Sequence, residues 1–100
     1  MNNSNSIYIK TCFVFGSNEA GRHGKGAALF AVKHHGAQYG QGYGLQGSSF
    51  AIPTKDGSLK TLSLDKIAEY IKSFLTFAQE HPDMIFRLTP IGTGLAGLEK

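Results

Sequence analysis

Apolar residues form several runs along the chain, and their spacing separates predicted strands from predicted helices. Residues 7–15 combine β-branched and aromatic side chains and end at Gly16, which is typical of a strand buried on both faces. Residues 49–53 resemble a shorter strand ended by its proline, and residues 54–57 have the composition of a turn. Residues 84–91 form another apolar run. These runs predict three strands.

Two helices are predicted between these strands. The first covers residues 26–35 and ends at Gly36, which suits the left-handed conformation that closes many helices. The second begins near Ser63, whose hydroxyl can cap it, and ends around residues 81–82, because proline disfavours helical geometry in the residue before it. Its apolar residues recur at spacings of three and four and form one stripe: Leu64, Ile67, Ala68, Ile71, Phe74, Leu75 and Ala78.

The order of these elements indicates the fold class. Residues 39–48 show neither helical nor strand periodicity, and their glycines favour an extended loop of the kind that is commonly functional or mobile. Strands that alternate with helices predict crossover connections and a largely parallel sheet. We therefore expect an α/β fold with one domain over residues 7–100, preceded by a loose polar terminus over residues 1–6.

Composition limits the compartment and the partners. The chain has 100 residues, of which 41% are hydrophobic, so it can bury a modest core. Its formal net charge of +3 favours anions without identifying one. The polar start lacks the features of a signal peptide, and no apolar run approaches the length of a membrane span. We expect a cytoplasmic protein with no membrane partner, in which the single cysteine, Cys12, is a buried structural thiol.

Two classes of site are disfavoured. The ten lysines and arginines are dispersed and most aromatic residues lie in apolar segments, which argues against nucleic-acid binding. The residues that most often bind transition metals lack paired ligand spacing: Cys12, His23, His34, His35 and His81. We predict no metal and no other cofactor.

Two glycine-rich turns, at residues 16–26 and 91–97, each follow a predicted strand. Glycine lets backbone N–H groups approach a ligand directly, and amides that face the same way form a concave anion site. The first turn also leads into a helix, whose N-terminus favours negative charge. Ligands of open α/β sheets collect beyond the carboxyl ends of the strands, where both turns are expected. The turns therefore predict a ligand that carries phosphate.

The first turn does not match two common phosphate motifs. Residues 16–23 have the spacing of a P-loop, but Arg22 replaces its lysine and His23 replaces the hydroxyl residue that holds magnesium. The glycines of residues 21–26 follow the order G-x-x-G-x-G, opposite to the dinucleotide fingerprint, and no acidic residue lies between Glu19 and Asp56 to bind a ribose. Both a P-loop NTPase and an NAD-dependent dehydrogenase are disfavoured.

Residues 24–36 resemble the loop and first helix of macrodomains, particularly the branch of terminal ADP-ribose protein glycohydrolases. Residues 91–95 resemble the second, diphosphate-binding loop of that branch, and the resemblance extends from about residue 13 to residue 98. It implies a three-layer α/β/α fold with a largely parallel mixed sheet that binds ADP-ribose, with the diphosphate between the two loops. The ligand-binding candidates are Gly16, Ser17, Asn18, Gly21, Gly24, Lys25, Gly26, Ala27, Gly92, Thr93, Gly94, Leu95 and Ala96.

The resemblance also suggests catalytic residues. In that branch a lysine after the central strand attacks the anomeric carbon of the sugar, and Lys55 has a similar place here. A nucleophilic lysine must lose its proton, whereas a polar turn beside Asp56 favours the charged form. The family pattern has a proton-transferring aspartate where this chain has Ala96. A substitute would be Asp56, Glu19 or His23, of which His23 is chemically the most suitable.

Three functions follow from these observations. The first is a binding module for ADP-ribose or a related NAD-derived nucleotide, which needs no catalytic side chain. The second is an ADP-ribosyl hydrolase that uses Lys55 or His23. The third is a non-binding structural protein that uses a sheet edge for assembly. Macrodomains generally continue beyond the second loop, so the fold is expected to be shortened at its C-terminus and to form a homo-oligomer that covers the exposed sheet.

Overall fold

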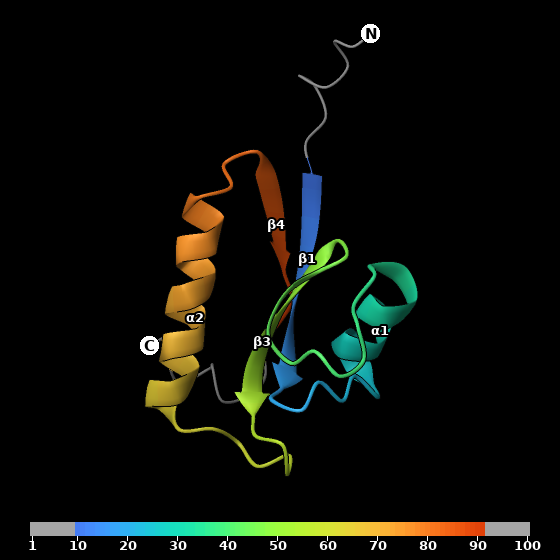
Figure 1. The fold of residues 1–100 in the computed structure, drawn as a ribbon, viewed down its shortest axis with the longest axis vertical. Coiled ribbons are helices and arrows are strands. Elements are labelled where there is room, and N and C mark those ends of the chain that lie inside the picture. Colours follow the sequence, from blue (N-terminus) through green and yellow to red (C-terminus); the bar gives the residue numbers. More distant parts are fainter. Residues whose placement is uncertain (1–9, 92–100) are drawn as a thin grey trace, which may run out of the picture.

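Four strands and two helices form the part of the chain that the structure describes, residues 10–91 of a computed structural model (Figure 1). Their order is β1 (Lys10–Asn18), α1 (Gly26–His34), β2 (Gly44–Gln46), β3 (Ser49–Lys55), α2 (Leu64–Gln79) and β4 (Met84–Leu88). The predicted loose terminus, residues 1–6, and the ligand-binding candidates of residues 92–96 lie outside the described residues. The predicted α/β class is confirmed for the described part.

The strands form one mixed sheet in the order β2-β3-β1-β4. β1 pairs in parallel with both β3 and β4, and β2 pairs antiparallel with β3. The register places Gly16 opposite Ile52 and Asn18 opposite Lys55. The carboxyl ends of β1 and β3 therefore meet at the same edge of the sheet, and the chain leaves this edge toward α1 after β1 and toward α2 after β3.

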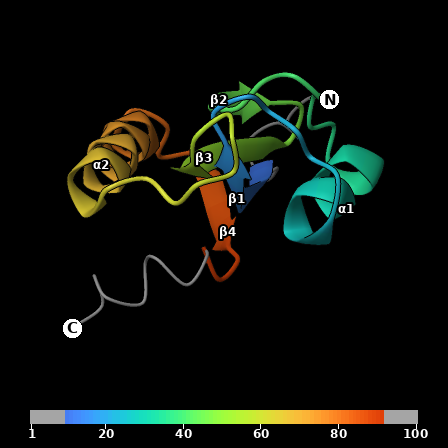
Figure 2. The same cartoon turned by 90° about the horizontal axis from the view of Figure 1, so that it is seen from below.

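The two helices lie on opposite faces of this sheet (Figure 2). Alternation along β1 directs Phe15 toward α1 and Val14 toward α2. α1 contributes Ala28 and Ala31, both buried, to the cluster with Phe15. Small side chains allow this helix to approach the sheet closely, as the alanines in the sequence suggest. The helix ends one residue before the predicted position, and Gly36 has the expected positive φ of 72°.

α2 covers the other face and agrees closely with its sequence pattern. The Ser63 hydroxyl accepts a hydrogen bond from the Lys66 N–H at 3.2 Å, which is the predicted cap. The centre of the buried stripe is Ile67 and Phe74. Three predicted members of the stripe are exposed: Leu64, Ala68 and Leu75. Ala68 and Leu75 follow the two central residues by one position, which rotates them about 100° away from the sheet.

Several element boundaries differ from the sequence prediction. β1 does not end before Gly16 but continues to Asn18, because residues 16–18 pair with residues 52–55 of β3. Residues 39–48 are not a continuous loop, because β2 pairs with residues 49–51 of β3 and forms a hairpin. β3 continues through Pro53 to Lys55. The missing N–H of Pro53 is tolerated because β2 has already ended at that point of the sheet. β4 ends at Leu88 rather than at residue 91. Directly beyond it, the N–H and hydroxyl of Thr89 both donate to the Val14 carbonyl.

The remaining expectations concern Cys12 and assembly. Cys12 is fully buried between the sheet and α2, and this burial raises the pKa of its thiol to about 11, as suits a structural residue. β4 is an outer strand of the described sheet and carries the exposed side chains of Ile85 and Leu88. The homo-oligomer stays a prediction. Within residues 10–91, neither helix has the length and apolar character that a membrane crossing requires.

Candidate functional site

A cavity of about 570 Å³ opens at the carboxyl ends of β1 and β3, where α1 begins. Its floor includes the end of β1, with Gly16, Ser17 and Asn18. The end of the following loop and the first residues of α1 supply four further lining residues, which are Gly24, Lys25, Gly26 and Ala27. These seven residues are ligand-binding candidates from the sequence, and the structure brings them together around one hollow. This is also the edge at which parallel α/β sheets bind ligands.

The cavity is lined by cations. Arg22 and Lys25 come from the loop between β1 and α1, and Lys55 comes from the last position of β3. All three are exposed, and no aspartate or glutamate is among the lining residues that the structure describes. Three positive side chains around one concave surface raise the local concentration of anions.

The N-terminus of α1 adds a second source of positive potential at the same place. Lys25 occupies the capping position in an extended conformation, and no side chain caps the helix. The first turn also lacks an acidic residue. The free N–H groups and the dipole of this end favour an anion. α2 differs in both respects, because Ser63 caps it and Asp65 lies in its first turn.

The loop that carries Arg22 is closed by the side chain of Asn18. Its Nδ2 donates to the Arg22 carbonyl at 3.0 Å, and its Oδ1 accepts from the Arg22 N–H at 2.9 Å. Ser17 is similarly occupied, since its hydroxyl donates to the Gly42 carbonyl. Both residues line the cavity, but their side chains hold the protein together. These two side chains are therefore not free to bind a ligand, which would meet the backbone at this part of the cavity.

Gly21 was predicted to bind the ligand, but it is buried and does not line the cavity. Its φ is +73°, and an added Cβ would lie 2.4 Å from the Gln41 backbone nitrogen. Its carbonyl accepts from the Gly40 N–H at 2.8 Å. Gly21 therefore allows two loops to pack against each other. In the sequence, a glycine needed for such packing looks the same as a glycine that contacts a ligand.

His23 was predicted as a proton-transfer group, and the structure does not bring it to the cavity. Its side chain is fully buried, with its ring edge-on to Phe15 at 5.2 Å between centroids. The Nε2 atom lies 3.0 Å from the Gln41 carbonyl oxygen and 3.3 Å from the Gln46 Oε1. A group that is sealed from the cavity cannot exchange protons with a ligand there. His23 instead joins the first loop to the segment that contains β2.

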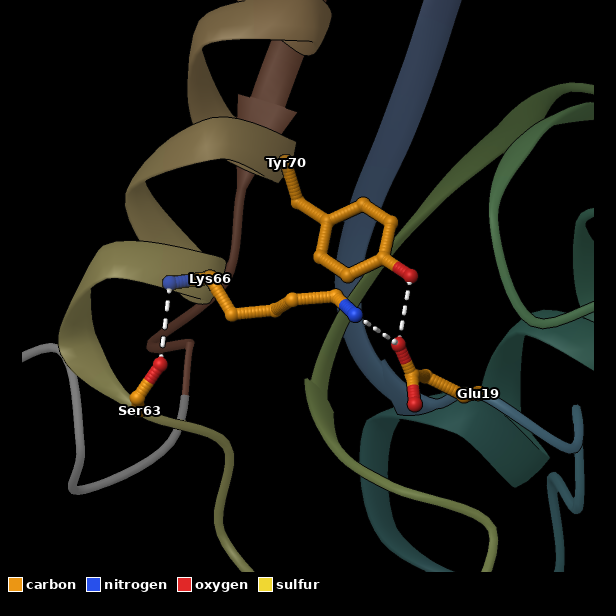
Figure 3. A network of polar contacts seen from close by, with 4 residues as sticks. All are labelled: Glu19, Ser63, Lys66 and Tyr70. Atoms are coloured by element: carbon orange, nitrogen blue, oxygen red, sulfur yellow. Dashed lines mark hydrogen bonds and ion pairs between the residues drawn. The ribbon is translucent and has the colours of Figure 1, made fainter.

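The other two acid-base candidates are also engaged elsewhere. Glu19 Oε2 accepts from the Tyr70 hydroxyl at 2.6 Å and lies 3.6 Å from the Lys66 amine (Figure 3). Asp56 Oδ1 accepts from the N–H groups of Lys60 and Ser58, and these bonds lower the pKa of its carboxyl. Neither carboxylate lines the cavity. Of the proposed catalytic residues, only Lys55 does.

The second glycine-rich loop begins close to the cavity. Pro90 is a lining residue, and Thr89 is anchored to β1 by its two hydrogen bonds to the Val14 carbonyl, at 2.8 and 3.1 Å. The candidates Gly92, Thr93, Gly94, Leu95 and Ala96 lie outside the described residues. The described chain therefore reaches the cavity at Pro90, directly before this loop, and a phosphate site formed jointly by the two loops stays a prediction.

Five lining residues were not among the sequence candidates: Arg22, Ala28, Thr54, Leu59 and Pro90. Arg22 could have been found, because it is a basic residue within a glycine-rich turn. Ala28 carries no chemical signal, and Leu59 and Pro90 reach the cavity only through the fold.

Comparisons with protein-family models, with curated proteins and with solved structures find no match for this chain. Within residues 10–91, no three histidine, cysteine, aspartate or glutamate side chains gather in a way that could hold a metal ion.

Proposed function

We propose that the protein binds ADP-ribose or a related NAD-derived nucleotide in this cavity, with the phosphate groups near the start of α1. The proposal includes a macrodomain-like, three-layer fold, supported by the helix on each face of the mixed sheet. The observation that carries it is the coincidence of three cations and an uncapped helix N-terminus around one hollow. Each attracts anions, and together they favour a ligand with more than one negative charge.

Gly24 supports a ligand that approaches the backbone. It lines the cavity, and an added Cβ would meet no atom within 4 Å. Its φ also lies outside the range that favours glycine. Neither packing nor backbone conformation explains the glycine at this position. A ligand that contacts the main chain here would explain it, because a Cβ would occupy part of the space available to that ligand.

The size and composition of the cavity agree with a small organic ligand. Its volume falls within the range of about 300–1,000 Å³ that is usual for such sites. Leu59, Pro90 and Ala27 contribute apolar surface beside the cations. This combination suits a phosphate joined to an organic group.

Calorimetry with ADP-ribose, ADP and AMP tests the proposal, with Lys25→Glu as the test variant and Lys72→Glu as its control. Both changes alter the net charge equally, but only Lys25 lines the cavity, while Lys72 is exposed on α2. We expect Lys25→Glu to weaken ADP-ribose binding about tenfold or more and Lys72→Glu to have little effect. The absence of binding heat with all three ligands at millimolar concentration would exclude the proposal.

A hydrolase is the second candidate, and the position of Lys55 in the cavity favours it. If Lys55 is a nucleophile, Lys55→Arg should abolish release of ADP-ribose from modified protein. The guanidinium keeps the positive charge but does not act as a nucleophile at neutral pH. If Lys55 only attracts phosphate, Lys55→Arg should bind ADP-ribose nearly as well as the parent. Equal turnover by the parent and Lys55→Arg would exclude the catalytic role.

A further inference from the structure

The turn after β3 contains the only residue other than glycine, within residues 10–91, whose φ is positive. This residue is Leu59, with a φ of 66°. The Asp56 N–H donates to the Lys60 carbonyl at 2.8 Å, and the Leu59 N–H donates to the Asp56 carbonyl at 3.0 Å. Lys55 and Thr61 form an antiparallel bridge on either side. Leu59 is therefore the third residue of a three-residue hairpin loop.

Glycine normally occupies this third position. Such loops consist of a type I turn followed by one left-handed residue, and a bulky side chain is strained in that conformation. The hydrogen bonds that Asp56 Oδ1 accepts from Ser58 and Lys60 hold the turn in place. The backbone of this turn thus gives no reason for leucine at residue 59.

Packing within the described chain does not explain leucine either. Its side chain is 52% exposed and belongs to neither of the two hydrophobic clusters. It does line the cavity, in the turn that directly follows the cationic lining residue Lys55. An exposed apolar side chain that is held in a strained conformation at the edge of a binding cavity is a feature typical of functional sites.

We infer that Leu59 is a specificity residue, which packs against the apolar face of the nucleoside part of the ligand while the nearby cations hold its phosphates. This inference rests on the proposed function. It adds the residue that makes the site bind a nucleotide more tightly than an inorganic anion. A leucine side chain makes no favourable polar contact with pyrophosphate, but it removes the carbon surface of a sugar or base from water. The exposed half of Leu59 supplies the area for that contact.

The test compares the affinities of the protein for ADP-ribose and for inorganic pyrophosphate, measured by calorimetry. We expect Leu59→Ala to weaken ADP-ribose binding roughly tenfold and to leave pyrophosphate binding unchanged. The control is Leu75→Ala, because Leu75 is 51% exposed on α2 and does not line the cavity. Leu59→Gly should weaken ADP-ribose binding to the same extent and raise Tm, since glycine adopts the left-handed conformation without strain.

The possible results separate the two proposals. If the parent protein binds neither ADP-ribose nor pyrophosphate, the proposed function fails and the role of Leu59 fails with it. If the parent binds both but Leu59→Ala keeps the same ratio of affinities, only the role of Leu59 is overturned. A fall in Tm of Leu59→Gly, with unchanged ratio, would indicate that leucine stabilises the turn instead.

Discussion

The hydroxyl of Tyr70 donates a hydrogen bond of 2.6 Å to Oε2 of Glu19, which connects the middle of α2 to the residue directly after β1. The Glu19 N–H donates to the Lys55 carbonyl at 2.8 Å. The amine of Lys66 lies near the same carboxylate (Figure 3). α2 is thus tied to the loop that borders the cavity, although it contributes no lining residue itself.

Tyr70→Phe should reduce the free energy of unfolding by about 1–2 kcal/mol at neutral pH, because it removes a hydrogen bond to a charged group. Urea denaturation measures this change. Glu69→Gln, on the preceding exposed residue of α2, serves as the control and should have a smaller effect. If Tyr70→Phe is as stable as the parent, the Tyr70–Glu19 bond does not contribute to the fold.

The same bond should produce a pH dependence. The pKa of Tyr70 is raised from 10.0 to about 12, and the hydrogen bond to Glu19 is the largest cause, followed by burial. The fold therefore favours the protonated phenol, so its contribution is complete below pH 10 and is lost as the pH rises toward 12. The stability difference between the parent and Tyr70→Phe should shrink across this range. A constant difference up to pH 12 would contradict the assignment.

Gly24→Ala should separate ligand binding from stability. An added Cβ meets no atom within 4 Å, so we expect the free energy of unfolding to change by less than about 0.5 kcal/mol. ADP-ribose binding should weaken, since the methyl group lies at the lining of the cavity. The matched control is Gly57→Ala, in another exposed turn, where the nearest contact would be 3.8 Å away. Equal affinities of the two variants would argue against backbone approach at Gly24.

Asn18→Asp tests how the first loop is held closed. The change preserves the acceptor for the Arg22 N–H but replaces the donor to the Arg22 carbonyl with an oxygen. We expect a loss of about 1–3 kcal/mol in unfolding free energy, because one hydrogen bond is replaced by a repulsive pair of oxygens. Denaturation midpoints measure the effect. A variant with parental stability would show that this side chain does not close the loop.

His23→Leu tests whether His23 has a structural role. The substitution removes the ring contact to the Gln41 carbonyl, which keeps the hydrogen bond from Gln46 Nε2, so we expect destabilisation of about 0.5–1.5 kcal/mol. Affinity for ADP-ribose, measured below the melting transition, should change much less than in Lys25→Glu. If His23→Leu were as stable as the parent but did not bind ADP-ribose, His23 would have to be assigned to the binding site.

The strongest local signals predicted the fold best. The Ser63 cap, the stripe around Ile67 and Phe74, and the β-branched run of β1 each depend on neighbours in the sequence, and the structure contains all three features. β2 has only three residues, which is too short for a periodic pattern. Its existence depends on pairing with β3, which the sequence does not display.

The residues that line the cavity were harder to predict, because the position of a residue in the fold decides whether it packs inside the protein or faces the cavity. Gly21 and Gly24 occur in one turn, yet the first packs against Gln41 and the second lines the cavity. His23 has suitable chemistry for proton transfer, but it is fully buried, with Phe15 and the segment of residues 39–46 packed around it. Leu59 carried no signal, since its left-handed conformation follows from the hairpin that surrounds it.

Titration of the ¹⁵N-labelled protein with ADP-ribose, followed by amide chemical shifts, tests the central claim most directly. The account predicts saturable shifts concentrated at residues 16–18, 22–27 and 54–55, which line the cavity or flank its lining. Amides on the outer face of α2, such as Lys72, should move little. Shifts confined to other parts of residues 10–91, or a spectrum unchanged at millimolar ADP-ribose, would contradict the assignment of this cavity as the nucleotide site.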